Sequence, residues 1–272
     1  MFRSDRAGWP AHSRFWFQAG VLLPLALAAC ALLCRDSGLD AALTGYFYDA
    51  AQQRFLVGSG GWADLLGHRV AKSLILTLWL LLLCAALAAP RLPALAGHRR
   101  LLWALVLAMA LGPVAVTLLK DINSHACPWN LKAYGGSADY SADWFVPRVA
   151  AGRCFPGGHA AGGFSLAALG FAGAALGRPG LRRAGLALGL GVGAAFSTLQ
   201  VAKGAHFMSH NLWSAAIDLG LAALVFAPLL APWRLSPRPS SPAPAPLPWR
   251  GRARGRRLRR GRAPECRRPR RG

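Results

Sequence analysis

Three short polar clusters at the edges of apolar stretches carry the side chains that could do chemistry in this chain. Lys120 ends one stretch, Pro156-Gly157-Gly158-His159 precedes a second, and His206 and His210 precede a third. Asp and Glu together number only 10, so acid and base chemistry is expected to fall to histidine, whose pKa lies near neutral pH.

Two histidines and a cation suit the transfer of a phosphoryl group. That reaction needs a nucleophile, an acid for the leaving oxygen, and donors that neutralise the charge on the equatorial oxygens. Histidine can fill the first two roles. The glycines at 157 and 158, just before an apolar helix, would let backbone N–H groups approach an anion, and Lys120 would add a point charge.

Each cluster also has a simpler interpretation. His159 could cap a helix, His206 could be an interfacial polar residue, and Lys120 could extend its charge to the membrane surface. His206 and His210 are four residues apart and could ligate a metal on one helix face, but no third ligand is obvious. The joint placement of the clusters favours chemistry, and we expect neither a metal nor a cofactor.

The elements that position these clusters are apolar stretches long enough to cross a bilayer as helices. We expect an all-α polytopic membrane protein with six transmembrane helices in a bundle, at residues 15–34, 73–89, 101–119, 160–177, 184–202 and 211–231. A lipoprotein cleavage site at Leu27-Ala28-Ala29-Cys30 is an alternative for the first stretch, but the apolar run continues beyond it. The loop 35–72 shows no chemistry and is expected to hold short interfacial helices.

Basic residues predict the orientation. The short connectors 90–100 and 178–183 and the C-terminus are rich in arginine, whereas the loops 35–72 and 120–157 hold fewer basic residues for their length. Both termini should therefore be cytoplasmic. The three polar clusters then converge on the outer face.

The chain is expected to divide into a cytoplasmic N-terminus (1–14), a helical domain (15–231, with the motifs in 100–231) and a C-terminal segment (232–272). Seven prolines make 232–248 an extended linker, and residues 249–272 hold twelve Arg against one Glu. We expect this disordered tail to contact anionic lipids of the cytoplasmic leaflet. Nucleic-acid binding is not favoured, because no reader domain accompanies the charge.

Together the clusters resemble the type 2 phosphatidic acid phosphatase and vanadium haloperoxidase superfamily, whose motifs run K-x6-R-P, P-S-G-H and S-R-x5-H-x3-D. Lys120 with Cys127-Pro128 is similar to the first motif, and Pro156-Gly157-Gly158-His159 to the second. Gln200, His206 and His210 follow the third. The chain departs from the pattern at Cys127, Gly157, Gln200 and His210, which replace two arginines, a serine and an aspartate. The surroundings look like a divergent bacterial subgroup.

The resemblance implies roles for these residues. His206 would be the nucleophile, His159 the acid, and His210 would orient His206 by accepting a hydrogen bond from it. Lys120, Gly157, Gly158 and Gln200 would bind phosphate, and Lys203, Arg148 and Arg153 could substitute for the lost arginines.

The implied activity is a lipid phosphatase of the bacterial inner membrane, working at the outer face through a phosphohistidine. A lipid phosphotransferase and a noncatalytic lipid-binding or transport protein are the alternatives. The lipid and the oligomeric state stay open.

Cysteine placement predicts one disulfide. Cys127 and Cys154 both fall in the outer loop 120–157, where an oxidising compartment permits bonding. Such a bond would tie the first motif to the second.

Two features stay undecided. Glycines crowd 160–193, either for helix packing or for lipid access. Asp218 lies within the last apolar stretch as a possible polar partner in the bundle.

Overall fold

The computed structural model describes residues 11–58, 61 and 70–231. Residues 1–10, part of the loop 35–72 and the whole segment 232–272 lie outside the described residues. The linker and tail predictions fall on that last segment and stay predictions.

The described residues are predominantly helical, as the sequence predicts. Five helices among them are long and apolar enough to cross a membrane, which makes the chain an integral membrane protein. The first runs from Ala11 to Asp36 as α1 (Ala11–Phe17), the π-helical η1 (Gln18–Leu22) and α2 (Leu23–Asp36). The others are α5 (Ala71–Ala88), α7 (Arg99–Lys120), α10 (Pro179–Ala202) and α11 (Met208–Leu230). Each overlaps a predicted stretch.

The remaining predicted stretch, 160–177, is helical but built from shorter pieces. α8 (Gly158–Phe164) leads through one 3-10 turn, η6 (Ser165–Ala167), into α9 (Ala168–Ala175). Most of its residues are buried against α10, α11 and α7. The count of six spans stays a prediction.

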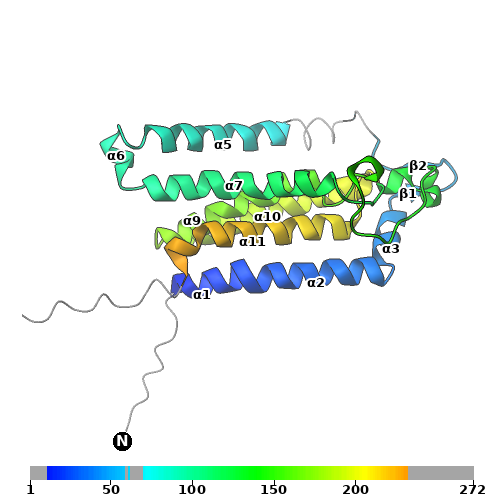
Figure 1. Cartoon of the computed structure of the whole chain (residues 1–272), viewed down its shortest axis with the longest axis horizontal. Coiled ribbons are helices and arrows are strands. Elements are labelled where there is room, and N and C mark those ends of the chain that lie inside the picture. The colour runs from blue at the N-terminus through cyan, green and yellow to red at the C-terminus, as the bar shows by residue number, and fades with distance from the viewer. Residues whose placement is uncertain (1–10, 59–60, 62–69, 232–272) are drawn as a thin grey trace, which may run out of the picture. The chain divides into compact units, whose positions relative to one another are not determined.

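The connectors gather at two opposite ends of the helices (Figure 1). α6 (Pro93–Ala96), within the arginine-bearing connector 90–100, lies at one end with α1. At the other end lie α3 (Leu39–Gly45) and the antiparallel hairpin of β1 (Tyr48–Asp49) and β2 (Arg54–Phe55), which the sequence did not predict. α7 ends at Lys120 and α8 begins beside His159 at this second end, where the connector from α10 to α11 carries His206.

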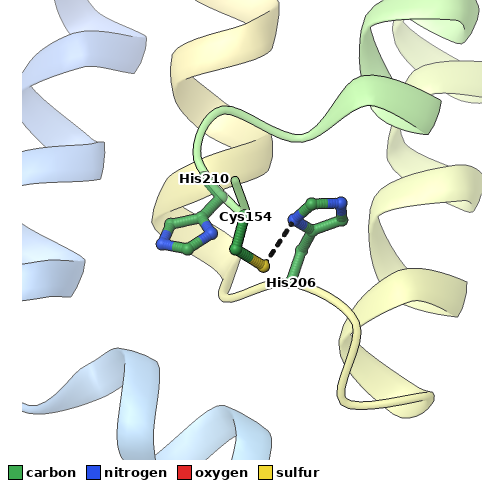
Figure 2. Close-up of side chains that lie close together, drawn as sticks. All are labelled: Cys154, His206 and His210. Carbon is green, nitrogen blue, oxygen red and sulfur yellow. Dashed lines mark hydrogen bonds between the residues drawn. The ribbon is translucent and has the colours of Figure 1, made fainter. Parts of the chain in front are cut away.

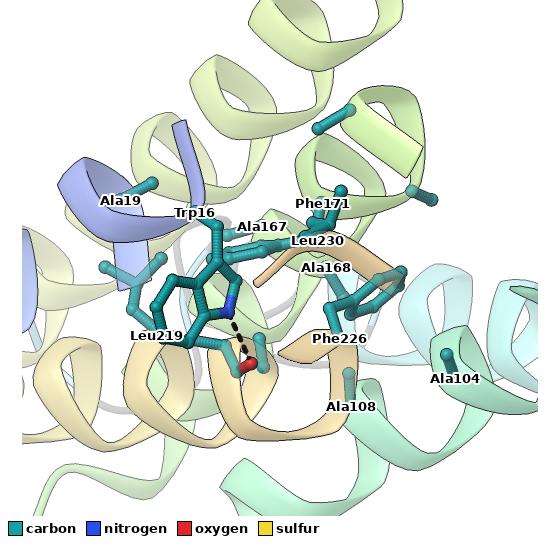
Figure 3. Packing of buried hydrophobic residues seen from close by; sticks show 14 of the residues in the cluster. Trp16, Ala19, Ala104, Ala108, Ala167, Ala168, Phe171, Leu219, Phe226 and Leu230 are labelled. Atoms are coloured by element: carbon teal, nitrogen blue, oxygen red, sulfur yellow. Dashed lines mark hydrogen bonds between the residues drawn. The ribbon is translucent and has the colours of Figure 1, made fainter. Parts of the chain in front are cut away.

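α11 packs against α2, α7 and α8 and forms the centre of the bundle. Phe171 of α9 and Phe226 of α11 are fully buried, with ring centroids 5.8 Å apart. The indole of Trp16 donates a hydrogen bond to the carbonyl of Ala223 at 2.8 Å (Figure 3). Packing and hydrogen bonds, rather than the hydrophobic effect, hold helices together in a bilayer. The Trp16 hydrogen bond therefore attaches the first helix to the last, and the Phe171–Phe226 contact attaches α9 to α11.

Several of the crowded glycines allow close helix packing. A Cβ at Gly185 would lie 2.4 Å from the backbone nitrogen of Gly170, and one at Gly189 would lie 2.2 Å from that of Ala167. The backbones of α10 and of the α8–α9 stretch therefore touch directly, which leaves no passage for a lipid at these positions.

Candidate active site

The start of α11 is fixed by a carboxylate from a distant part of the chain. Asp40, on α3, is buried and accepts hydrogen bonds from the backbone N–H of Ser209, at 2.9 Å, and from its hydroxyl. A carboxylate here satisfies a free N–H of the first turn and matches the positive end of the helix. Burial raises the pKa of Asp40, and the hydrogen bonds from Ser209 act in the opposite direction. The loop 35–72 thus positions the helix that follows His206.

His206 lies in a tight connector between α10 and α11. The backbone N–H groups of Ala205 and His206 both donate to the carbonyl of Gln200, at 2.9 and 3.3 Å. Gly204 has a φ of +67°, and a Cβ there would lie 2.2 Å from the ring of Phe55. The connector is therefore closely constrained, and the His206 side chain is held in a buried position.

Nδ1 of His206 faces Sγ of Cys154 at 3.5 Å (Figure 2). The predicted disulfide between Cys127 and Cys154 is present. Because a disulfide sulfur carries no hydrogen, a hydrogen bond across this contact requires His206 Nδ1–H as the donor. The backbone carbonyl of Cys154 is a second acceptor for the ring. The contact with Sγ favours the tautomer with its proton on Nδ1 and its lone pair on Nε2.

Burial lowers the pKa of His206 to about 3, with further lowering by the charges of Lys120 and His159. The hydrogen bond to Cys154 acts in the opposite direction. His206 is therefore neutral at physiological pH, as a nucleophilic imidazole must be. Lys120 and His159, although they come from α7 and α8, both act electrostatically on His206.

Lys120 also contacts the glycine turn before His159. It is the last residue of α7, whereas Gly158 is the first of α8. A Cβ placed on Gly158 would lie 3.5 Å from Nζ of Lys120. The predicted cluster of Lys120, Gly158, His159 and His206 is thus brought together in space.

The prediction that the N–H of Gly157 binds phosphate needs correction. That N–H donates to the carbonyl of His210 at 3.0 Å, and the carbonyl of Gly157 accepts from the hydroxyl of Ser214 at 2.9 Å. A Cβ at Gly157 would lie 2.1 Å from Oδ1 of Asn211. Gly157 therefore packs the turn onto α11, and Gly158 is the remaining candidate for a backbone donor.

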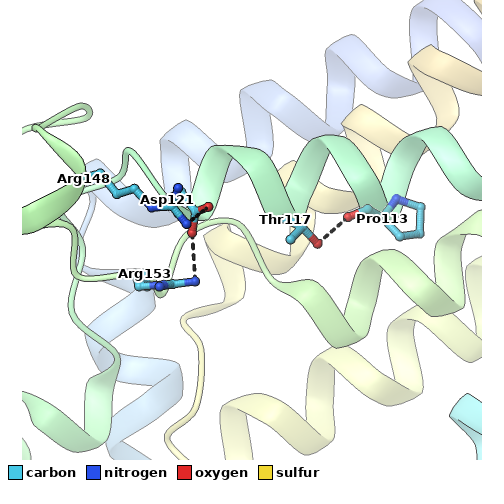
Figure 4. A network of polar contacts seen from close by, with 5 residues as sticks. All are labelled: Pro113, Thr117, Asp121, Arg148 and Arg153. Carbon is cyan, nitrogen blue, oxygen red and sulfur yellow. Dashed lines mark hydrogen bonds and ion pairs between the residues drawn. The ribbon is translucent and has the colours of Figure 1, made fainter.

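Two arginines converge on Asp121, the residue that follows Lys120 (Figure 4). Asp121 lies next to Lys120 in sequence and forms ion pairs with Arg153 at 2.8 Å and with Arg148 at 3.1 Å. The Arg153 charge acts on Lys120 electrostatically. Arg148 and Arg153, the possible substitutes for the lost motif arginines, therefore lie near the site. They are held there by Asp121, whose role the sequence did not suggest.

His210 does not orient His206 as expected. α11 begins at Met208, so His206 precedes the helix and the expected one-turn spacing does not apply. The two ring centroids are 5.9 Å apart, no hydrogen bond joins them, and Nδ1 of His210 has no partner. His210 instead packs among rings, with centroids 5.3 Å from Phe155, 5.4 Å from Phe207 and 5.5 Å from His125. The acceptor for His206 is Cys154.

His125 is a buried histidine that the sequence reasoning missed. It stacks on His210 and contacts Phe155 and Trp144. Burial lowers its pKa to about 4, and the charge of Arg35 adds to that shift. A neutral, buried ring of this kind fits a packing role.

Gln200 and Lys203 were also expected to bind phosphate. Gln200 is buried and contributes its backbone carbonyl to the His206 connector. Lys203 lines a separate hollow of about 400 Å³ with Asp49, Arg54 and Trp129. Lys120, and not Lys203, is the lysine whose charge acts on His206.

A metal site was the alternative for His206 and His210. One ligand atom from each, with Sγ of Cys154 as a third, lie within 4.8 Å of one another (Figure 2). A cysteine binds a metal as its thiolate, and Cys154 is held in the disulfide. With that bond intact, the cluster offers a metal only two imidazoles.

The family model described as the PAP2 superfamily matches residues 101–234, which contain all the motif positions. The motif-bearing part of this chain belongs to the PAP2 superfamily. No curated protein and no solved structure gives a match.

Membership of the PAP2 superfamily indicates a phosphatase acting on phosphate esters, and the apolar helices place it in a membrane. The sequence did not point to three residues, Asp40, Asp121 and His125, that act through contacts at the end of the helices that carries His206. Asp121 alone carried a signal, because it directly follows Lys120 and is followed in the same loop by arginines.

Proposed function

We propose that this chain is a lipid phosphatase in which His206 is the nucleophile and forms a phosphohistidine. The main support is the convergence of Lys120, His159 and a neutral, buried His206 at one end of the helices. In this proposal Nε2 of His206 attacks phosphorus, because Nδ1 faces Cys154.

His159 is the proposed acid. As the bond between Nε2 and phosphorus forms, the bond from phosphorus to the ester oxygen breaks, and His159 donates its proton to the leaving alkoxide. A water molecule then attacks the phosphohistidine and gives a proton to His159. The Nε2–phosphorus bond breaks, inorganic phosphate leaves, and both histidines return to their starting states.

Cationic side chains are the proposed substitutes for the missing motif arginines. Lys120 would neutralise charge on the equatorial oxygens, with Arg153 as the second cation because its charge already acts on Lys120. Gly158 would contribute a backbone N–H. His210 has no chemical step in this proposal. Its ring packs against the rings of His125 and His206.

A lipid is the proposed substrate because the cluster lies where α7 and α10 end and α11 begins, at the expected membrane boundary. The arginine-bearing connectors lie at the opposite end of the helices, which supports an active site on the outer face. In a bacterial cell that face would be the outer side of the inner membrane.

Phosphate release from purified full-length protein tests the proposal. The substrates are phosphatidic acid, phosphatidylglycerol phosphate, an isoprenyl diphosphate and a lipid A phosphate, each in detergent. His206→Ala and His159→Ala should each abolish release, whereas His98→Ala, an exposed histidine of the connector 90–100, should not. A chelator should leave the rate unchanged, because cationic side chains carry the charge neutralisation.

Two outcomes would contradict hydrolysis. Release only when an acceptor lipid is added would indicate a phosphotransferase. Binding of the lipids without release or transfer would indicate a noncatalytic protein.

A further inference from the structure

A second polar site lies at the end of the helices opposite to His206. A hollow of about 390 Å³ opens between the first helix and the start of α10, and Arg14, Arg182 and Arg183 line it together with Phe15 and Leu186. At 1.5 Å per residue along α10, Arg183 lies about 30 Å from the connector that carries His206. The hollow is therefore separate from the candidate active site.

The hollow gathers positive charge. None of the described residues that line it is Asp or Glu, and the ion pairs in that part of the chain involve only Asp121 and Asp139 as acids. Arg182 and Arg183 lie in the first turns of α10, where the helix dipole is positive and the first turn holds no acidic residue. An anion bound among these guanidinium groups would relieve their mutual repulsion.

Packing orients one of the arginines before any ligand binds. The guanidinium of Arg182 lies 5.4 Å from the ring centroid of Phe15, which in turn contacts Phe171 edge to face at 5.4 Å. A Cβ at Gly173 would lie 2.4 Å from the backbone nitrogen of Arg182, so the helices meet closely there. A preorganised arginine loses less conformational entropy when it binds a ligand.

The residues that line the hollow indicate which class of anion it binds. Guanidinium groups bind phosphate with paired hydrogen bonds, and Phe15 and Leu186 supply an apolar wall beside them. Basic pockets between membrane helices at the cytoplasmic side suit phospholipid headgroups. We propose that this hollow binds the phosphodiester headgroup of an anionic membrane phospholipid, whose acyl chains lie along the apolar wall. The proposal does not depend on the catalytic one.

Native mass spectrometry of the detergent-solubilised full chain, titrated with phosphatidylglycerol, tests it. The test variant is Arg14→Gln/Arg183→Gln, which removes two exposed charges and leaves the contact of Arg182 with Phe15 intact. Arg99→Gln/Arg100→Gln is the matched control, because it removes two exposed arginines from the other arginine-bearing connector. We expect one tightly bound lipid, with affinity lowered about tenfold or more in the test variant and less than about threefold in the control.

Further experiments distinguish binding of an anionic phospholipid headgroup from binding of free phosphate or of any phospholipid. Phosphatidylcholine should bind at least about tenfold more weakly than phosphatidylglycerol, and an equimolar amount of inorganic phosphate should not displace the lipid. His206→Ala should retain the bound lipid, whether or not the wild type hydrolyses phosphate esters. Equal losses in the test and control variants, equal binding of phosphatidylcholine, displacement by phosphate, or loss of the lipid in His206→Ala would each overturn the proposal.

Discussion

Nδ1 of His206 lies 3.5 Å from the disulfide sulfur of Cys154, so the oxidation state of that sulfur bears on which ring nitrogen carries the proton. A disulfide can only accept a hydrogen bond, whereas a thiol can also donate one. The Cys127–Cys154 disulfide therefore does more than close the loop between the first two motifs. It favours the tautomer that leaves Nε2 free to attack.

Cys127→Ala, which leaves Cys154 as a free thiol, should lower kcat by about tenfold or more, because the thiol can donate to Nδ1 and favour the wrong tautomer. Phosphate release measures the effect, and mass spectrometry verifies that Cys154 is free. Cys84→Ala, an exposed cysteine on α5, is the control. A folded Cys127→Ala protein with wild-type kcat would contradict the role assigned to the disulfide.

The two glycines before His159 should respond differently to substitution. Gly157→Ala places a methyl group 2.1 Å from Oδ1 of Asn211 and should destabilise the fold by about 1–3 kcal/mol, with loss of activity. Gly158→Ala meets only Nζ of Lys120, at 3.5 Å, and should fold normally. Gly162→Ala, with no atom within 4 Å, is the control. Thermal unfolding in detergent measures all three, and equal stability of the two motif variants would refute this packing.

His125 should make stability depend on pH. Its folded pKa, about 4, is below the unfolded value near 6.5, so its contribution is complete above pH 6.5 and is lost as pH falls toward 4. The slope is at most about 1.4 kcal/mol per pH unit for one histidine. His206, with a pKa of about 3, adds a similar loss that extends to lower pH.

His125→Phe preserves a ring among Trp144 and Phe155 and removes the titrating group. The free energy of unfolding, measured from pH 7 to pH 4.5, should fall less steeply than in the wild type. His98→Phe, which replaces an exposed histidine, should keep the wild-type slope. An unchanged slope in His125→Phe would show that the buried ring does not resist protonation.

Asp218, for which the sequence offered only a possible polar partner, lies against a glycine of α7. It is buried, its carboxylate oxygens have no hydrogen-bond partner, and a Cβ at Gly112 would lie 1.6 Å from Oδ1. Gly112→Ala should therefore destabilise the fold by about 1–3 kcal/mol. Adding Asp218→Ala should restore part of that loss, because the clashing oxygen is gone.

Thermal unfolding of the single variants and the double variant measures this coupling. Gly220→Ala is the control, because a Cβ at this position of α11 would meet no atom within 4 Å. Purely additive losses for Gly112→Ala and Asp218→Ala would mean that the two positions do not touch.

The fold was largely predictable because hydropathy reports helix length directly: five predicted stretches coincide with long helices. The 3-10 turn at Ser165–Ala167 was not, because it depends on how α8 and α9 pack against α10. The β1–β2 hairpin also escaped prediction, since two-residue strands leave almost no periodic pattern.

The site was predictable where motif order carries the information, as at Lys120, His159 and His206. It was not where contacts join distant segments: Asp40 and Ser209 are 169 residues apart. His210 was expected to orient His206 because it stands at the aspartate position of the family motif, but α11 begins at Met208, after His206. No local pattern marks the residue at which a helix begins to within one or two positions.

Trapping the covalent intermediate tests directly whether His206 is the nucleophile. The purified protein is mixed with a lipid phosphate radiolabelled on its phosphate, quenched within milliseconds in alkali, digested and mapped. We predict label on the peptide carrying His206, stable in alkali and lost in acid, and absent from His206→Ala. Turnover of the substrate with no label on His206, or with label on another residue, would show that His206 is not the nucleophile.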